Sequence, residues 1–284
     1  MTSDGPAGRL VVVATPIGNM GDLSPRAADA LRHADLVCCE DTRRTGRLLQ
    51  HAAVAAPPLR RVDAHTEAEA AGDVVARVGR GETVALVTDA GTPGVSDPGT
   101  RVVAAVVAAG LAVEVVPGPV AAIAAVVLSG LPTDRLAIDG FLPRGGPERS
   151  VRLAELAVER RTTALYEAPG RVAATLAEVA AACGDDRPVA VARELTKLHE
   201  EVWRGPAGEA AAWAAAHEVR GEVVIVVGGA PAAEGAEGDD AVLVALRAAR
   251  AQGLSPGRAA AEVAAALGRP RREVYALALA ADET

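Results

Sequence analysis

The stretch TDAGTPGVSDPG, from Thr88 to Gly99, has the residue types and spacing of a loop that binds a small molecule. It follows a β-branched apolar run at 83–87 and precedes an apolar segment, so it joins a predicted strand to a predicted helix. Its glycines let the backbone approach a ligand closely, and Asp89 stands at the carboxyl end of the strand, where open α/β sheets bind ligands. A plain connection is the alternative, but such connections usually run about two to six residues.

The second half of this stretch has the pattern of a helix start. Ser96 or Asp97 is expected to cap the helix through a side-chain oxygen. Pro98 suits the first turn, because the N–H that proline lacks has no partner within a helix at that position. Gly110 is expected to end the helix in the left-handed conformation.

Further short motifs stand before and after this loop. They are TPIGN at 15–19, EDTRRT at 40–45, PGP at 117–119, GFLPR at 140–144 and ARELTK at 192–197. Together with DAGTPGVSDPG they resemble the ribosomal RNA small subunit methyltransferase I family, the cytidine 2′-O-methyltransferase branch of the tetrapyrrole methylase superfamily. The resemblance covers roughly residues 9–229, and a C-terminal segment is similar to that family's helical appendage.

The resemblance implies a cofactor and its place in the fold. Proteins of this superfamily hold S-adenosylmethionine folded in the cleft between two α/β domains, against the loop that DAGTPGVSD matches. On that basis, backbone carbonyls near Pro16 or Ala192 are expected to serve the adenine, and Tyr166 to cover it. The full set of expected cofactor contacts is Pro16, Asp89, Gly91, Thr92, Pro93, Val95, Ser96, Tyr166 and Ala192.

The EDTRRT motif carries the residues expected to assist methyl transfer. A sulfonium is already an activated donor, so the enzyme mainly aligns the acceptor oxygen, the methyl carbon and the leaving sulfur. A ribose hydroxyl is a poor nucleophile at neutral pH, and a nearby carboxylate or cation helps to remove its proton. The expected catalytic residues are therefore Glu40, Asp41 and Arg43. The alternative is that Asp41 or Thr42 only caps the following helix and the arginines are solvated.

Charged residues near these motifs are expected to contact the RNA substrate. They are Arg43, Arg44, Arg144, Arg193, Glu194 and Lys197. Lys197 is the only lysine among the 29 lysine and arginine residues, although an ordinary ion pair in a hairpin is the alternative for its cluster. Further arginines form separated patches, which suit a long phosphate backbone better than one compact macrocycle. These are Arg47, Arg149, Arg152 and the arginines between Arg258 and Arg272.

The composition of the chain limits the classes of protein to which it can belong. A formal net charge of −8 over 284 residues excludes a generally basic nucleic-acid coat, so RNA contacts must use local arginine patches. The three cysteines and five histidines have neither a disulfide framework nor the spacing of metal ligands, so we expect a cytoplasmic protein without a metal. Glycines and prolines divide the apolar zone at 102–128 into helix, strand and helix, and no secretory signal is recognised, so no membrane role is expected.

Alternating strand and helix patterns predict a first α/β domain at residues 1–117 with a parallel, doubly wound sheet. The four loops at the carboxyl ends of its first strands are expected to open on one edge. His65 ends the third of these strands and is expected to be structural rather than catalytic. The predicted strands are 9–14, 35–39, 61–65, 83–88 and 112–116, and the helices between them are 25–33, 45–50, 67–78 and the apolar segment 102–109.

A second α/β domain is predicted at residues 118–229, with a cleft between the two domains. A hairpin pattern in ARELTKLHEEVWRG indicates a mixed sheet. Residues 230–240 form a predicted linker, and 241–284 form a small helical unit that resembles a helix-turn-helix. The predicted strands of the second domain are 135–141, 162–167, 189–194, 200–204 and 222–227, and its helices are one that starts at about Val120, 148–159 and 171–183.

Three candidate functions stay open at this point. The sequence has no Walker A loop and no glycine fingerprint after its first strand, which disfavours P-loop chemistry, a dinucleotide site and the usual Rossmann-type methyltransferase. The resemblance implies 2′-O-methylation of a cytidine ribose in 16S ribosomal RNA of the small subunit, by a homodimer. A tetrapyrrole carbon methylase is the nearest enzymatic alternative. A regulator that binds a ligand in the cleft and nucleic acid through its terminal helices is the alternative from another class.

Overall fold

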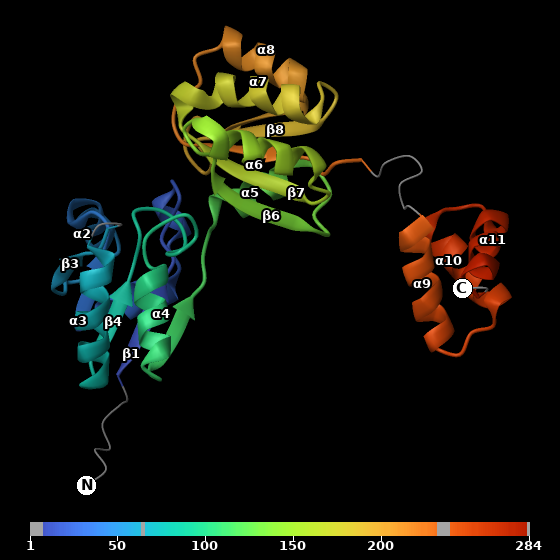
Figure 1. Cartoon of the computed structure of the whole chain (residues 1–284). Coiled ribbons are helices and arrows are strands. Elements are labelled where there is room, and N and C mark those ends of the chain that lie inside the picture. The colour runs from blue at the N-terminus through green and yellow to red at the C-terminus, as the bar shows by residue number, and fades with distance from the viewer. Residues whose placement is uncertain (1–7, 64–65, 232–238, 283–284) are drawn as a thin grey trace. The chain divides into compact units, whose positions relative to one another are not determined.

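The computed structural model describes residues 8–63, 66–231 and 239–282 (Figure 1). The chain divides into two compact units, one ending at Ala230 and the other beginning at Pro231. The first unit contains two five-stranded sheets, one parallel and one mixed, which confirms the predicted α/β class. The finer division at residue 118 stays a prediction. His65 and most of the predicted linker lie outside the described residues.

The first sheet has the strand order β3-β2-β4-β1-β5, and all of its pairings are parallel. Its strands are β1 (Arg9–Val13), β2 (Leu36–Cys39), β3 (Leu59–Arg61), β4 (Thr83–Leu86) and β5 (Ala112–Val116). On one face pack α1 (Pro25–Arg32) and α2 (Thr42–His51), and on the other α3 (Glu67–Gly79) and α4 (Thr100–Ala108). Because helices cover both faces, the central strands are continuous apolar runs rather than alternating ones.

The third strand differs from the prediction. It spans Leu59–Arg61 instead of 61–65 and pairs with β2 alone, at the edge of the sheet. Arg60 tolerates this position because its guanidinium reaches Asp73 of α3 at 2.5 Å. Val62 and Asp63, which belong to the predicted strand, lie outside β3. The predicted bounds were wrong because the apolar run in this part of the sequence is short and stands next to arginines.

The second sheet has the strand order β6-β7-β10-β8-β9, in which β6 and β7 are parallel and the other pairings are antiparallel. Its strands are β6 (Leu136–Phe141), β7 (Thr162–Glu167), β8 (Pro188–Arg193), β9 (Glu201–Pro206) and β10 (Val223–Val227). The register places Arg193 of β8 opposite Glu201 of β9, which confirms the predicted hairpin.

The two faces of the second sheet are covered unequally. Its helices are α5 (Ala121–Ser129), α6 (Gly146–Val158), α7 (Val172–Cys183) and α8 (Ala207–Ala216). Helices α6, α7 and α8 pack over larger side chains such as Leu165 and Ile225. On the opposite face α5 packs over the small side chains of Ala164, Ala190 and Ala192. The helix α8 was not predicted, because its alanine-rich sequence shows helix-forming residues on every side and no apolar stripe.

The second compact unit contains α9 (Asp239–Ala251), α10 (Pro256–Leu267) and α11 (Arg271–Asp282). Its core includes Val242, Leu246, Val263 and Val274, and Gly268 ends α10 in the left-handed conformation as predicted. This core is separate from those of the two sheets. Among the helices that the structure describes, none combines the length and apolar character needed to cross a membrane.

Candidate active site

Two loops of the first sheet meet at its carboxyl edge. The loop after β1 and the loop after β4 exchange backbone hydrogen bonds: Thr15 N donates to Gly91 O at 2.8 Å, and Gly91 N donates to Thr15 O at 3.1 Å. The Thr15 hydroxyl also donates to Thr88 O at 3.2 Å. Gly91 has a φ of 83°, a conformation that favours glycine. TPIGN and DAGTP therefore form one connected backbone surface.

The helix after the glycine loop begins later than predicted. Its N-cap is Gly99, and neither Ser96 nor Asp97 caps it. The buried carboxylate of Glu67 takes that role from α3, because its Oε1 accepts from Gly99 N at 2.8 Å and from Arg101 N at 2.7 Å. Ser96, with a φ of 61°, and Asp97 are thereby left to line a cavity. This corrects the expectation that they cap α4.

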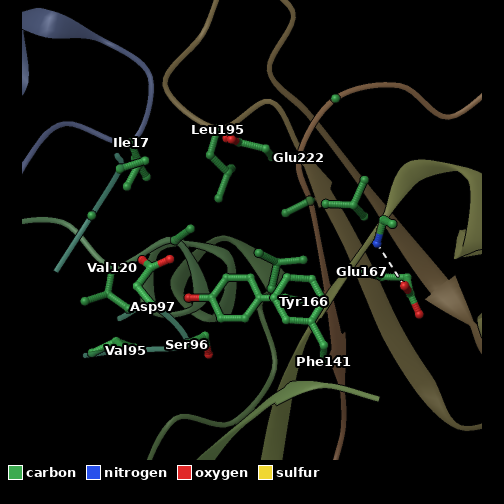
Figure 2. Close-up of a pocket in the computed structure, with 18 of the residues that line it drawn as sticks. Ile17, Val95, Ser96, Asp97, Val120, Phe141, Tyr166, Glu167, Leu195 and Glu222 are labelled. Carbon is green, nitrogen blue, oxygen red and sulfur yellow. Dashed lines mark hydrogen bonds between the residues drawn. The ribbon is translucent and has the colours of Figure 1, made fainter. Parts of the chain in front are cut away.

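The larger cavity, of about 330 Å3, lies between this loop and the α5 face of the second sheet (Figure 2). We call it the acidic cavity, because the charged residues among its described lining are the carboxylates of Asp97, Glu167 and Glu222, with no lysine or arginine. Glu167 is bonded to Thr175 and Arg171, and Glu222 is paired with Lys197 from outside the cavity. Its other walls are apolar or small. They include Ile17, Ala90, Gly91, Thr92, Val95, Ser96, Val120, Phe141, Tyr166, Ala192, Leu195 and Val224.

Tyr166 forms the aromatic wall of the acidic cavity. Its ring lies 5.5 Å, centroid to centroid, from the ring of Phe141. Its hydroxyl accepts a long hydrogen bond of 3.4 Å from Ala122 N at the start of α5 and points toward Asp97 in Figure 2. Burial raises the pKa of Tyr166. Phe141 was not predicted as a site residue; it lies within the GFLPR motif, of which only Arg144 was selected.

Asp97 is the carboxylate of this cavity whose ionisation is most perturbed. Burial, reinforced by the nearby charges of Glu40, Asp89 and Glu222, raises the pKa of Asp97 to about 6, while a hydrogen bond from Thr88 opposes the shift. No ion pair to Asp97 is found within the described part of the chain. A half-buried carboxylate without a cation favours a positively charged ligand or a proton beside it.

A second cavity of about 230 Å3 adjoins the first and shares Ile17, Ala90 and Glu222 with it. We call it the basic cavity, because Arg44, Arg47 and Lys197 are among its lining residues. Its remaining lining residues are Thr15, Pro16, Gly18, Met20, Thr45, Leu48, Thr88 and Asp89.

The loop after β8 closes one side of the basic cavity. Lys197 Nζ lies 2.9 Å from a carboxylate oxygen of Glu194 and 2.9 Å from one of Glu222, and these bonds raise the pKa of Lys197 although burial opposes them. Thr196 Oγ1 accepts from Asn19 N at 2.9 Å, which joins the loop to TPIGN. A Cβ on Gly18 would lie 2.5 Å from the Lys197 side chain, so the loops meet only because glycine stands there.

The expected cofactor contacts divide between the two cavities. Six of them line the acidic cavity: Gly91, Thr92, Val95, Ser96, Tyr166 and Ala192. Pro16 and Asp89 line the basic cavity instead. Pro93 lines neither cavity; it is buried beside Gly99 within the loop. Asp97, Leu195 and Glu222 were not predicted as site residues, and Gly221, which has a φ of 82°, joins them in the lining.

The expected catalytic residues are placed differently from one another. Asp41 caps α2 by accepting from Arg43 N at 2.8 Å, and Arg43 donates from its guanidinium to the same carboxylate at 3.1 and 2.7 Å. These bonds hold the pKa of Asp41 well below its usual range. Glu40 accepts from the Thr88 hydroxyl at 3.4 Å, and burial together with the charge of Asp89 raises its pKa. Asp41 therefore shows the capping role given as the alternative.

The expected RNA contacts also separate into groups. Arg44 lies 3.5 Å from Asp89 at the basic cavity, Arg193 pairs with Glu201 at 2.6 Å, and Arg144 is exposed. Arg149 is buried, and its guanidinium pairs with Glu178 and donates to Pro143 O at 2.8 Å.

Arg149 is thus a structural residue, and the prediction that it belongs to an RNA-binding patch was wrong. A buried cation that is fully paired offers no charge to a phosphate. Arg152 pairs with Asp139 and, at 2.6 Å, with Glu155. Among the residues that the structure describes, no group of histidine, cysteine, aspartate and glutamate side chains could hold a metal ion.

Comparison with known proteins gives consistent matches along the chain. A family model described as Tetrapyrrole (Corrin/Porphyrin) Methylases matches residues 9–211, and one described as RsmI C-terminal HTH domain matches 236–282. The chain is 42% identical over 273 residues to ribosomal RNA small subunit methyltransferase I of Synechocystis sp., covering 96% of this chain and 98% of that protein. It is 40% identical over 282 residues to the protein of that name from Escherichia coli O157:H7, covering 98% and 97%.

Solved structures show a likeness of fold. Uroporphyrin-III C-methyltransferase from Thermus thermophilus, complexed with S-adenosylhomocysteine, is 24% identical with a TM-score of 0.54. The match covers 78% of this chain and 97% of that one.

Proposed function

Since the chain belongs to the ribosomal RNA small subunit methyltransferase I family of the tetrapyrrole methylases, we propose that it methylates the 2′-hydroxyl of a cytidine ribose in 16S ribosomal RNA, using S-adenosylmethionine. The observation that carries this proposal is the pair of adjoining cavities of opposite charge, which share Ile17, Ala90 and Glu222. One cavity suits a cationic donor and the other a polyanionic acceptor. The methyl group would cross at the residues that they share.

The acidic cavity fits S-adenosylmethionine in size and charge. About 330 Å3 falls within the usual range of ligand cavities, roughly 300–1,000 Å3. The cofactor carries a sulfonium and an ammonium, and Asp97 offers negative charge that no ion pair within the described residues neutralises, whereas Glu222 is already paired with Lys197 at 2.9 Å. Tyr166 supplies an aromatic wall on which a purine can stack. When bound, the cofactor would supply an activated methyl group.

The basic cavity fits the phosphates that flank a ribose. Arg47 presents a guanidinium from α2 that has no ion pair within the described residues, and Arg44 presents one that lies 3.5 Å from Asp89. Lys197, in the loop after β8, is paired with Glu194 and Glu222 and would have to share its charge with a phosphate. Arg43, whose side chain is 86% exposed, extends the same positive surface beyond the cavity. Such contacts position a nucleic-acid backbone without reading its sequence. The acceptor oxygen would then be held next to Ile17 and Ala90.

The proton of the ribose hydroxyl requires a base close to the shared wall. Asp41 is a poor candidate, because Arg43 holds its pKa well below the usual range. Asp97 and Glu40 both have raised pKa values, and of the two only Asp97 lines the acidic cavity. An acid with a pKa of about 6 is ionised at neutral pH and still accepts a proton readily. We assign proton acceptance to Asp97, with Glu40 as the second carboxylate of the site.

The alternatives make different demands on the cavities. A tetrapyrrole precursor also carries several negative charges, so the basic cavity alone does not choose between it and RNA, whereas arginines spread over separate surfaces suit a long phosphate backbone better than one compact macrocycle. A regulator without catalysis would not need a carboxylate that is both half-buried and unpaired. The homodimer, the cytoplasmic location and the RNA role of the helical unit, whose Arg258, Arg271 and Arg272 are exposed, are further predictions.

Transfer of a labelled methyl group tests the proposal. Purified protein should label 30S particles from a strain that lacks the enzyme and should leave uroporphyrinogen unlabelled. Removal of residues 241–284 should weaken the labelling while calorimetry shows unchanged cofactor affinity. Labelling of uroporphyrinogen but not of 30S particles would overturn the assignment.

A further inference from the structure

A leucine beside the basic cavity is almost fully exposed. Leu198 has 93% of its surface accessible, the largest value among the large apolar residues that the structure describes. It follows Lys197, which lines the basic cavity, and Leu195 in the same loop lines the acidic cavity. The loop after β8 thus has one leucine turned inward and one turned to solvent. Burying such a side chain against a partner is favourable in proportion to the apolar area that is covered.

Hydrogen bonds fix the loop that carries Leu198. Glu194 N donates to Glu222 O at 3.0 Å, and Lys197 N donates to Glu194 O at 3.0 Å. Thr196 N donates to a carboxylate oxygen of Glu200 at 2.6 Å. None of these bonds uses the side chain of Leu198. The loop that carries the exposed leucine is therefore ordered before any partner binds, which lowers the entropy that is lost when Leu198 contacts a partner.

The same loop contains strained backbone. Glu194 has a φ of 51° and Thr196 a φ of 65°, both in the left-handed region that residues with a Cβ rarely adopt. Such strain persists only when the surroundings hold it, and it gathers at functional sites. Here the bond from Asn19 N to the Thr196 hydroxyl and the paired Lys197 hold it.

We propose that Leu198 contacts an unstacked base of the RNA next to the ribose in the basic cavity, an inference that rests on the proposed function. Leu198 directly follows Lys197, and the cavity that Lys197 lines also holds Arg44 and Arg47, whose charges match the phosphates of RNA. Proteins that recognise RNA in single-stranded segments contact bases that are splayed out of the stack, and apolar side chains such as leucine enter between bases. Lys197 would then contact the RNA backbone, and Leu198 would contact the base of an adjoining nucleotide.

A second copy of this chain fits the surface less well. The neighbours of Leu198 in the loop are polar or charged, namely Lys197, His199, Glu200 and Glu201. Protein interfaces bury a core from which charged residues are depleted. One leucine within charged residues is suited to a single base rather than to a broad apolar contact.

The test compares Leu198→Ala with Val158→Ala in the full chain. Val158 ends α6, is 73% exposed and lines neither cavity, so it controls for loss of an exposed apolar side chain. Leu198→Ala should raise the KM for 30S particles about tenfold, while cofactor affinity and melting temperature stay unchanged. Val158→Ala should leave all three unchanged.

Salt dependence separates a base contact from a phosphate contact. Leu198→Ala should weaken RNA binding equally at low and high salt, whereas Arg44→Ala should reduce the slope of log K against log salt by about 1. An unchanged KM in Leu198→Ala, or a loss of self-association measured by light scattering, would overturn the inference while leaving the proposed function in place. Absence of transfer to 30S particles by the unaltered protein would overturn both.

Discussion

The acidic and basic cavities share part of their walls but are built from different sources. The acidic cavity lies against the second sheet, which contributes Tyr166, Ala192 and Val224 to its lining, and Asp97 is its carboxylate without an ion pair among the described residues. The basic cavity is built by loops of the first sheet and by α2, which supplies Arg44 and Arg47. In the proposed function, opposite charges on either side of a shared wall keep a cationic donor and an anionic acceptor apart within one site.

The largest effect should come from Gly91→Val, which addresses the acidic cavity alone. Gly91 has a φ of 83°, and a branched side chain there is strained and would project toward the cavity. We expect cofactor affinity, measured by calorimetry, to fall by about a hundredfold or more. Gly94→Val is the matched control, because Gly94 has a φ of 82° but lines neither cavity. Equal losses in both variants would attribute the effect to strain in the loop rather than to the cavity.

Asp97→Asn should have the next largest effect and act on the chemical step. Loss of the proton acceptor should lower kcat about a hundredfold in single-turnover assays. Because the pKa of Asp97 is raised to about 6, its carboxylate is ionised above that pH. The rate of the unaltered protein should therefore rise with pH through an inflection near 6 and then level off.

The inflection should be absent in Asp97→Asn. Binding of the positive cofactor favours the ionised form and would move the inflection below 6 in the complex. Glu40→Gln is the comparison, since Glu40 lines neither cavity. A larger loss of kcat in Glu40→Gln than in Asp97→Asn would transfer the role to Glu40.

Arg44→Ala and Arg47→Ala should affect the basic cavity with a smaller effect. Each should raise the KM for 30S particles about tenfold at moderate salt and leave cofactor affinity unchanged. Arg161→Ala is the control, because Arg161 pairs with Glu159 outside both cavities. If the KM for the cofactor rises as much as that for 30S particles, the division between the two cavities is wrong.

The smallest effect should follow Tyr166→Phe, which keeps the aromatic wall and removes one hydroxyl. The hydroxyl makes a long bond of 3.4 Å with Ala122 N. We expect cofactor affinity to fall about threefold, since a bond of that length contributes less than a typical hydrogen bond. Tyr166→Ala should cost distinctly more affinity. Equal affinities in the two variants would show that the ring contributes nothing.

Most of the fold could be predicted because it depends on local patterns. Continuous apolar strands, helix starts and the hairpin of β8 and β9 each have a signal within a few residues. The short edge strand β3 and the alanine-rich α8 were misplaced or missed, because edge pairing and an all-alanine face have no such signal. The α/β class and the parallel first sheet follow from the order of elements, and the mixed second sheet follows from the hairpin pattern.

The site was only partly predictable because distant residues decide it. Asp97 has the sequence pattern of a helix cap, and only the structure shows that Glu67, far back in the chain, takes that role. Arg149 and Arg44 look alike in sequence, but Arg149 is buried against Glu178 whereas Arg44 lines the basic cavity. The glycine loop was located because its composition is unusual within one short stretch. Which carboxylate faces which cavity depends on packing between segments.

Mass spectrometry of the reaction product tests the central claim most directly. 30S particles from a strain that lacks the enzyme are incubated with this protein and a cofactor that carries a deuterated methyl group, and the 16S RNA is then digested to nucleosides. The account predicts one new labelled nucleoside, 2′-O-methylcytidine, which forms about a hundredfold more slowly when Asp97→Asn replaces the unaltered protein. A label on a base, or on a ribose other than that of cytidine, would contradict it.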